Sequence, residues 1–514
     1  MKNKFILSAI GFLFFFACKQ EKKEVVVEKK PNIILFFVDD MGWQDTSVPF
    51  WNKRTPFNDL YKTPNMERLA KEGMKFTQAY ATAVCSPTRV SLMTGMNAAR
   101  HRVTNWTLKK DALQPMETNH KELQFPEWNV NGLSPVKGID KAVYATPLPQ
   151  LLQEAGYYTI HSGKAHFGAI GTPGANPINL GFDVNIAGHA AGAPESYLGT
   201  ENFGNGKNGK EVWAVPGLEK YHGKDIFLTE ALTQEALLSV DNAVKAEQPF
   251  FLYMAHYAIH TPLYGDDRYV QKYLDIGLDP KEAKYASMIE GMDKSLGDIM
   301  NYLDDNKLSD NTILLFMSDN GGLSVHGRGG KPNTHNKPLN SGKGSVYEGG
   351  IREPMLVKWP EKVQPNSVTD EKVIIEDFYP TILEIAGVES PKTVQTVDGI
   401  SFVSVLNNKK AIVKNRPLFW HYPNEWGPSG PGIGASSAVR FGDYKLVYYH
   451  LDSRMELFNI KEDIGEVTNL VESNTDKVKE LAKILSDHLR KVDAQMPSLK
   501  KTGIKVALPD AIVP

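Results

Sequence analysis

Two strand-length apolar runs constrain the fold of this chain more than any other feature. Residues 33–38 read Ile-Ile-Leu-Phe-Phe-Val and are followed by two aspartates. Residues 312–317 read Thr-Ile-Leu-Leu-Phe-Met and are followed by Ser-Asp-Asn-Gly-Gly. Strands that are apolar on both faces are typical of a mainly parallel sheet covered by helices on both sides. The two runs therefore predict an α/β protein with a doubly wound sheet sandwiched by helices.

Helical segments separate the strand candidates, as a doubly wound sheet requires. We expect helices over residues 65–72, 148–154 and 225–247; the first two are closed by glycines. After them the pattern changes to short alternating strands near residues 438–446 and 456–459 and an amphipathic helix over 477–492. The sequence predicts a catalytic domain over residues 31–405 and a smaller C-terminal α+β subdomain over 406–514.

Both apolar runs end in acidic residues. Asp39 and Asp40 follow the first run, and Asp319 and Asn320 follow the second. Ligands of doubly wound sheets bind beyond the carboxyl ends of the strands, and adjacent aspartates repel each other unless a positive charge offsets them. Aspartate and asparagine oxygens suit Ca²⁺ or Mg²⁺. Either cluster alone is more often a turn or a helix cap, but the two together predict a metal site.

The overall charge does not indicate a nucleic-acid partner. The 514 residues carry 58 Lys and Arg against 60 Asp and Glu, and we expect no concentrated basic face.

The N-terminus is typical of an exported bacterial lipoprotein. Residues 1–17 begin with two lysines, continue as an apolar stretch and end before Cys18, which predicts a signal peptide. The residues before Cys18 resemble a loose lipobox, so we expect lipidation of Cys18 and a polar tether over 18–30. The stretch is too short for a permanent membrane helix. We predict a protein of the bacterial envelope, in the periplasm or on the outer membrane, that contacts the membrane only through its lipid anchor.

Cys85 has no potential disulfide partner if Cys18 is lipidated, because the chain has two cysteines. It opens the run Cys-Ser-Pro-Thr-Arg over residues 85–89, with Thr-Gly at 94–95. The run is compatible with a buried thiol before a helix. It also resembles the Cys-x-Pro-x-Arg maturation motif of the formylglycine-dependent, type I sulfatases of the alkaline phosphatase superfamily.

Further motifs of that family occur in its order between residue 31 and about residue 399. They are Asn-Ile-Ile leading to Asp-Asp-Met-Gly (32–42), Gly-Lys-Ala-His (163–166), His-Thr-Pro (260–262), and Gly-Lys-Gly before Tyr-Glu-Gly-Gly-Ile-Arg-Glu-Pro (342–354). The chain is therefore similar to sulfatases along most of its length, and to the bacterial lipoprotein type of carbohydrate sulfatase.

The resemblance implies sulfate-ester hydrolysis. A formylglycine-generating maturation enzyme would oxidise Cys85, and the aldehyde hydrate would attack sulfur and form a covalent sulfo-enzyme. One Ca²⁺, or Mg²⁺ as a substitute, would be bound by Asp39, Asp40, Cys85, Asp319 and Asn320. Arg89 falls one helical turn after residue 85, which places that residue at a helix N-terminus that favours an anion.

The resemblance also assigns the remaining catalytic roles. Lys164 and Lys343 would bind sulfate oxygens. His260 would protonate the departing oxygen, and His166 would act as the base that expels sulfate. His256, four residues before His260, is an alternative acid.

Substrate recognition is less directly encoded. We expect His101 and His189 to contact the substrate, with loop capping as the alternative for His189. Residues 168–223 are rich in Gly, Asn and Pro and are expected to form loops over the pocket. Four tryptophans are candidates either for stacking on sugar rings or for packing: Trp106, Trp213, Trp420 and Trp426.

An envelope location favours a sulfated carbohydrate, with exo action on galactose- or hexosamine-type units in polysaccharide degradation. Alternatives are an arylsulfatase with small substrates, a phosphatase or phosphonate hydrolase of the same superfamily, and an inactive glycan-binding lipoprotein. The phosphatase would usually have Ser or Thr as nucleophile and further histidines for two zinc ions.

Overall fold

The computed structural model describes residues 29–113, 115–206, 212–408 and 416–513. The predicted signal peptide, Cys18 and the tether up to residue 28 lie outside the described residues. In the described part of the chain, no helix combines the length and the apolar character needed to cross a membrane.

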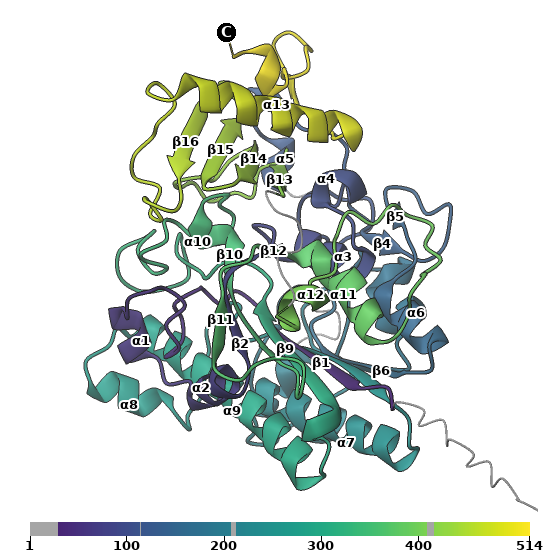
Figure 1. Ribbon diagram of the computed structural model, residues 1–514. Helices are drawn as coiled ribbons and strands as arrows, with labels where there is room; N and C mark the ends of the chain where they lie inside the picture. The colour runs from purple at the N-terminus through teal and green to yellow at the C-terminus, as the bar shows by residue number, and fades with distance from the viewer. Residues whose placement is uncertain (1–28, 114, 207–211, 409–415, 514) are drawn as a thin grey trace, which may run out of the picture.

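The first apolar run forms β1 (Asn32–Val38), near the middle of a nine-stranded sheet (Figure 1). The strand order is β11-β2-β10-β9-β1-β8-β6-β7, and β12 also pairs with β2. The other strands are β2 (Met74–Tyr80), β6 (Tyr158–Gly163), β7 (Val184–Ile186), β8 (Phe250–Ala255), β9 (Thr312–Ser318), β10 (Arg352–Lys358), β11 (Ser367–Thr369) and β12 (Val373–Ile374). Strand β10 runs antiparallel to both β2 and β9, and the other pairs are parallel. The predicted mainly parallel sheet is confirmed.

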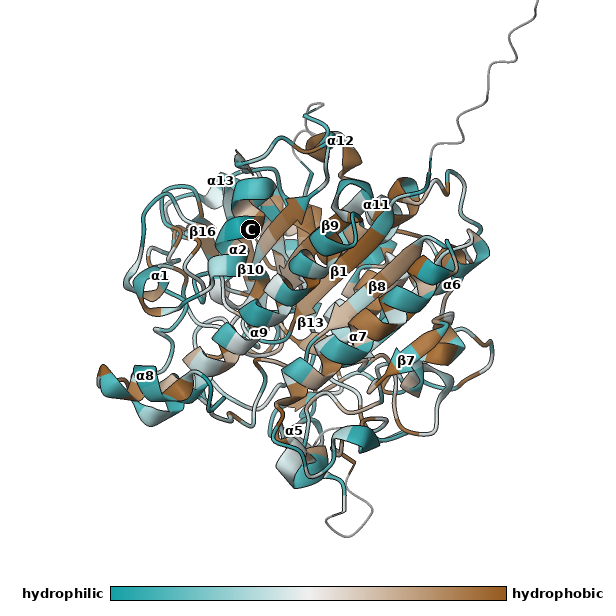
Figure 2. Cartoon of the chain, turned by 90° about the horizontal axis from the view of Figure 1, so that it is seen from below, coloured by the Kyte–Doolittle hydropathy of each residue, from teal (hydrophilic) through white to brown (hydrophobic). Residues whose placement is uncertain are grey.

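Alternate residues of β1 face two separate hydrophobic cores. Ile33, Leu35 and Phe37 belong to one core, with α3 (Cys85–Thr94), α6 (Leu148–Glu154), α11 (Phe378–Ile385) and α12 (Val403–Leu406). Ile34 and Phe36 belong to the other, with α2 (Pro64–Glu72), α7 (Leu228–Lys245) and α9 (Pro280–Asp305). In Figure 2 the brown strands lie behind α7 and α9, whose outward sides are largely teal. The helices thus cover both faces of the sheet, which is why its strands are apolar throughout.

The C-terminal part forms its own small layer. Strands β13 (Leu418–Tyr422), β14 (Ser436–Phe441), β15 (Tyr444–Tyr449) and β16 (Met455–Asn459) form an antiparallel sheet, and α13 (Thr475–Lys491) packs against it. The predicted antiparallel sheet with a closing helix is confirmed, and Figure 1 shows it above the carboxyl ends of the central strands.

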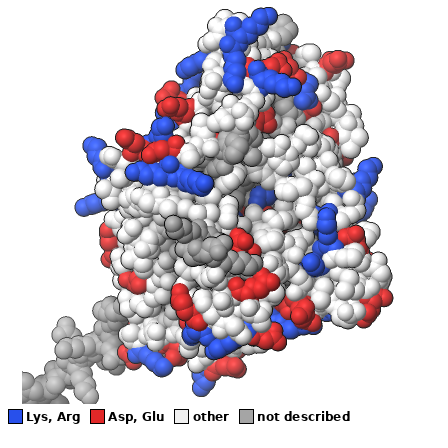
Figure 3. All heavy atoms as spheres, turned by 180° about the vertical axis from the view of Figure 1, so that it is seen from behind, with Lys and Arg blue, Asp and Glu red and all other residues white. Residues whose placement is uncertain are grey.

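Short elements connect these layers. The remaining helices are α1 (Pro56–Leu60), α4 (Ala98–His101), α5 (Pro115–Thr118), α8 (Val270–Asp275) and α10 (Glu348–Ile351); the remaining strands are β3 (Leu123–Gln124), β4 (Leu133–Ser134), β5 (Val143–Tyr144) and β17 (Ser498–Leu499). On the face seen in Figure 3, basic and acidic side chains are interspersed over the described residues.

Candidate active site

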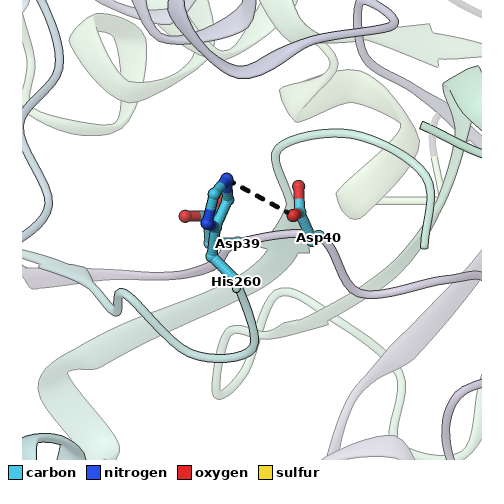
Figure 4. A group of neighbouring side chains, drawn as sticks. All are labelled: Asp39, Asp40 and His260. Carbon is cyan, nitrogen blue, oxygen red and sulfur yellow. Dashed lines mark ion pairs between the residues drawn. The ribbon is translucent and has the colours of Figure 1, made fainter. Parts of the chain in front are cut away.

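Acidic side chains from two neighbouring strands meet at the carboxyl end of the sheet. One ligand-type atom from each of Asp39, Asp40 and His260 lies within 4.8 Å of the other two (Figure 4). His260 Nε2 is 3.6 Å from Asp40 Oδ2. Asn320 Nδ2 donates to Asp40 Oδ1 at 2.8 Å, and Asp319 Oδ1 accepts from the Asp40 backbone N–H at 3.2 Å. Four predicted metal ligands therefore lie together, because parallel strands end at the same edge.

Two buried lysines pair with the adjacent aspartates. Lys164 Nζ donates to Asp39 Oδ2 at 2.6 Å, and Lys343 Nζ lies 2.6 Å from Asp40 Oδ1. Burial opposes ionisation of both members of the second pair, but Asp40 raises the pKa of Lys343, and Lys343 lowers the pKa of Asp40. The positive charges offset the repulsion between the two carboxylates.

The donor set fits a hard cation. Among the described residues, Asp39 Oδ1, Asp40 Oδ2 and Asn320 Oδ1 are buried without a hydrogen-bond partner. Burial and then Asp319 raise the pKa of Asp39, so one lysine does not fully compensate this carboxylate. A buried polar atom without a partner costs about 1–3 kcal/mol, and oxygen ligands of this kind suit Ca²⁺ or Mg²⁺. These three oxygens would hold the ion, together with Asp319, whose Oδ1 lies 3.2 Å from the Asp40 nitrogen.

Helix α3 begins at Cys85, as the motif predicts. The thiol is buried and free. Burial raises its pKa, while Lys164 and Lys343 act in the opposite direction. The two lysines are therefore close enough to stabilise negative charge at residue 85.

Arg89 lies behind the site. Its side chain is completely buried; Nε donates to Asp319 Oδ2 at 3.0 Å and Nη1 donates to the Lys164 carbonyl at 2.8 Å. The guanidinium thereby connects the ends of β6 and β9. Lys343 lines the pocket, whereas Arg89 and Lys164 do not, so contact between Lys164 and sulfate stays a prediction. Arg89 positions Asp319 and the Lys164 loop.

His166 is held with one ring nitrogen free. Its Nε2 lies 2.8 Å from the Thr107 carbonyl, so Nε2 carries the proton and donates it, and Nδ1 has no partner in the described structure. Burial, followed by Lys164, lowers the pKa of His166. The ring is thus neutral, with a lone pair available to accept a proton.

His260 is the better placed of the two candidate acids. It lines the pocket, and its Nδ1 lies 2.7 Å from the Thr261 carbonyl. Burial and then Lys343 lower its pKa to about 3. His256 is completely buried, with Nε2 2.9 Å from Ser295 Oγ, and does not line the pocket.

A pocket of about 650 Å³ opens onto these groups. Its lining includes Cys85, His166, His260 and Lys343, and further out Trp106, Glu195, Trp213, Tyr264, His326 and Trp426. Glu195 and Trp213 come from the 168–223 segment, which was predicted to form loops over the pocket. Trp420 is buried in the core, where Nε1 donates to the Ala81 carbonyl at 2.8 Å.

Two predicted substrate contacts do not reach this pocket. His101 is completely buried; its Nε2 lies 3.0 Å from Ser91 Oγ and its Nδ1 accepts the Val103 N–H at 3.0 Å. His189 lies beside Tyr257, and its carbonyl accepts the His166 N–H at 3.2 Å. Both residues support catalytic segments through packing or backbone contacts.

A buried network that the sequence did not reveal lies under the metal loop. Arg328 Nη1 lies 3.1 Å from Asp45 Oδ1, and Nε donates to Glu282 Oε2 at 3.1 Å. Tyr285 Oη donates to Asp45 Oδ2 at 2.7 Å and lies 3.1 Å from the Asp40 carbonyl. This network fixes the loop that follows Asp40 against α9.

The C-terminal sheet holds the loop that carries Lys343. Lys445 Nζ donates to the Val346 carbonyl at 3.0 Å and to Glu348 Oε1 at 3.1 Å. The Val346 N–H donates to the Gly432 carbonyl at 3.0 Å. Trp426 packs so closely on Gly344 that a Cβ there would lie 2.0 Å from the ring.

Comparison with known proteins agrees with this geometry. The family model described as Sulfatase matches residues 31–388. This chain belongs to the sulfatase family. It is a sulfuric ester hydrolase of type I, with the alkaline phosphatase-like fold. A second model, described as N-sulphoglucosamine sulphohydrolase, C-terminal, matches residues 342–495.

Individual relatives cover nearly the whole sulfatase chain. A sulfatase from Formosa agariphila is 30% identical and covers 95% of this chain and 93% of its own length. The N-acetylgalactosamine-6-sulfatase of Canis lupus familiaris is 29% identical over 83% of this chain and 73% of its own. The crystal structure of Ps i-CgsB in complex with k-i-k-neocarrahexaose has a TM-score of 0.71 and 28% identity, covering 90% of this chain and 93% of that one.

Proposed function

We propose that this sulfatase removes sulfate esters from a glycan or oligosaccharide, using formylglycine made from Cys85 by a maturation enzyme. The observation that carries the proposal is that Cys85, His166, His260 and Lys343 line one pocket, beside the buried acidic cluster. The relatives named N-acetylgalactosamine-6-sulfatase, and the similar structure solved with k-i-k-neocarrahexaose, support a carbohydrate substrate.

In this proposal the lysines bind the sulfate group. Lys343 lines the pocket and donates to sulfate oxygens, while Lys164 adds positive charge from behind Asp39. When oxidised, residue 85 supplies the nucleophile. Asp39, Asp40, Asp319 and Asn320, with residue 85, would hold a Ca²⁺ ion, which would supply further neutralisation of the sulfate charge. Arg89 keeps Asp319 in place for this task.

The two histidines divide the proton transfers. The free Nδ1 of His166 accepts a proton near residue 85, because Nε2 is committed to the Thr107 carbonyl. His260 is partly exposed at the pocket and gives a proton to the departing sugar oxygen. Burial and Lys343 lower the pKa of His260, whereas the Asp40 carboxylate, 3.6 Å from Nε2, acts in the opposite direction and stabilises the proton that the ring has to deliver.

The proposal also covers the cellular location and the domain organisation of the enzyme. We assign residues 1–17 to a signal peptide, Cys18 to lipidation and 18–30 to a tether, so that the enzyme acts in the bacterial envelope. Residues 31–405 form the catalytic domain and 406–514 the C-terminal subdomain. The buried sulfate site favours a protruding sulfate, and hence exo action on galactose- or hexosamine-type units.

The test is the chemical state of residue 85 in active protein. Protein co-expressed with a maturation enzyme should give a peptide that reacts with hydrazide and resists thiol alkylation, and should release sulfate from sulfated mono- or oligosaccharides. Cys85→Ala should abolish sulfate release while the far-UV circular dichroism spectrum is retained. Active protein with residue 85 entirely as thiol would contradict the mechanism, and faster turnover of an aryl sulfate than of every sugar would contradict the glycan substrate.

A further inference from the structure

The pocket offers little positive charge, including the part lined by Trp106, Glu195, Trp213, Tyr264, His326 and Trp426, which we call the outer pocket. Among the described residues that line it, Lys343 and Glu195 are the ones with a permanently charged side chain. Lys343 is already paired with Asp40 and is proposed to bind the scissile sulfate. A second anionic group on the substrate would therefore find no unpaired lysine or arginine among these lining residues.

Glu195 adds a negative charge to the same wall. Its backbone N–H donates to the Trp213 carbonyl at 2.8 Å, which connects two lining residues of the 168–223 segment. Its side chain is partly exposed, and its carboxylate has no ion pair or hydrogen bond to the residues that the structure describes. A free carboxylate accepts hydrogen bonds from sugar hydroxyls and repels sulfate or carboxylate groups.

Aromatic rings form much of the pocket wall. Trp106 and Trp213 lie with ring centroids 6.5 Å apart, and His326 lies 5.4 Å from Trp426. Burial, and then Lys343, lower the pKa of His326, so this ring is uncharged at neutral pH. Such rings offer flat apolar faces with a few polar edges, which suits the face of a sugar ring.

We infer that the outer pocket selects sulfate esters on sugar units that carry no second anionic group, with Trp213 and its neighbours contacting the sugar and Glu195 excluding polyanionic chains. The inference rests on the proposed function and narrows its substrate class. It makes Glu195 a specificity-determining residue. The expected substrate is a monosulfated unit flanked by neutral sugars, in contrast to a disulfated unit or one flanked by a uronic acid.

The size of the effect follows from Coulomb's law. Two unit charges roughly 6–8 Å apart, in a medium between protein and water, change binding by about fivefold to tenfold. We therefore expect kcat/KM for a monosulfated sugar to exceed that for the same sugar with one more sulfate by about that factor. Because part of the pocket is open to solvent, 0.5 M NaCl should reduce the difference.

The experiment compares the wild-type enzyme, Glu195→Gln and Glu389→Gln on matched pairs of mono- and disulfated galactose and N-acetylgalactosamine, with sulfate release as the readout. Glu389 is exposed and does not line the pocket, so its variant controls for loss of one surface charge. The ratio of kcat/KM for disulfated to monosulfated sugar should rise about fivefold in Glu195→Gln and stay at the wild-type value in Glu389→Gln.

The aromatic contact is tested separately. Trp213→Ala should raise KM for the monosulfated sugar several-fold with a smaller change in kcat, and Trp213→Phe should restore most of the loss. An unchanged ratio in Glu195→Gln, or equal use of mono- and disulfated sugars by the wild-type enzyme, would overturn the inference while sulfatase activity stands. Failure to release sulfate from any ester would instead overturn the proposed function.

Discussion

Replacing Arg328 by methionine should weaken both the fold and the active site. The Arg328 guanidinium is completely buried, interacts with Asp45 and Glu282, and stacks 3.9 Å from the centroid of the Tyr285 ring. Methionine retains much of the volume but leaves two carboxylates in the interior without their cation. Burial works in the opposite direction, but Arg328 lowers the pKa of Glu282, so this carboxylate is charged in the folded protein.

The expected loss of stability is large. Breaking a buried ion pair by removing one partner costs about 3–5 kcal/mol, compared with a total of about 5–15 kcal/mol for a typical domain. The variant should therefore fold, but unfold at a clearly lower urea concentration. Tyr285 connects Asp45 to the Asp40 carbonyl, so the metal loop should also loosen. Loss of such supporting contacts typically lowers metal affinity or activity about 10- to 100-fold.

Urea unfolding followed by circular dichroism, with kcat/KM for sulfate release, measures both effects. Adding Glu282→Gln to Arg328→Met removes one uncompensated charge and should recover about half of the lost stability. Arg54→Met is the matched control, because Arg54 forms an exposed pair with Asp59 and such pairs contribute about 1 kcal/mol or less. If Arg328→Met loses no more stability than Arg54→Met, the buried network does not contribute as argued.

Two further predictions concern the metal and the pH dependence of stability. Purified enzyme should hold one Ca²⁺ per chain by elemental analysis, and Asp319→Ala should lose both the ion and sulfate release; two zinc ions per chain would favour the phosphatase alternative. Burial and then Asp377 raise the pKa of Glu376 from 4.5 to about 8, so the folded protein favours the neutral carboxyl. The neutral Glu376 side chain therefore contributes fully to the free energy of unfolding below pH 4.5, and this contribution is lost as the pH rises to about 8. When the pH is raised from 5.5 to 8, the free energy of unfolding measured in urea should therefore fall less for Glu376→Gln than for the wild type. Equal decreases in the two proteins would contradict this prediction.

The helices and strands that were predicted correctly are those whose own residues have a clear hydrophobic pattern. The run 33–38 became β1 because every residue is apolar and both faces are covered. Helix α6 has the predicted bounds, and α7 spans Leu228–Lys245 within the predicted 225–247. The longest helix, α9, was not predicted. Its buried face contains alanines, serines and two glycines, Gly291 and Gly297, that lie against Asp266 and Asn65, so its apolar stripe is interrupted by small residues that depend on tertiary contacts.

The site residues, too, were predictable only where the local sequence indicated their position. Residues at strand ends were predictable, since the topology of a parallel sheet brings them to one edge. His101 was expected to contact the substrate because it follows the Cys85 helix closely in sequence. Its side chain instead lies against Ser91. Glu195 and His326 lie in irregular loops, where neither periodicity nor spacing indicates which side chain will face the pocket. The buried network around Arg328 could not be predicted either, because its partners Asp45 and Glu282 are distant in sequence.

The contacts between the C-terminal sheet and the Lys343 loop also bear on how this enzyme is made and how it can change. Asp39 is translated early, whereas Trp426 and Lys445, which hold that loop, are translated about four hundred residues later. Long-range contacts of this kind form slowly, so the catalytic centre is among the last parts of the molecule to be assembled. Exchange of the C-terminal segment between relatives would alter turnover and substrate choice at the same time, because Trp426 supports the lysine loop and lines the pocket mouth.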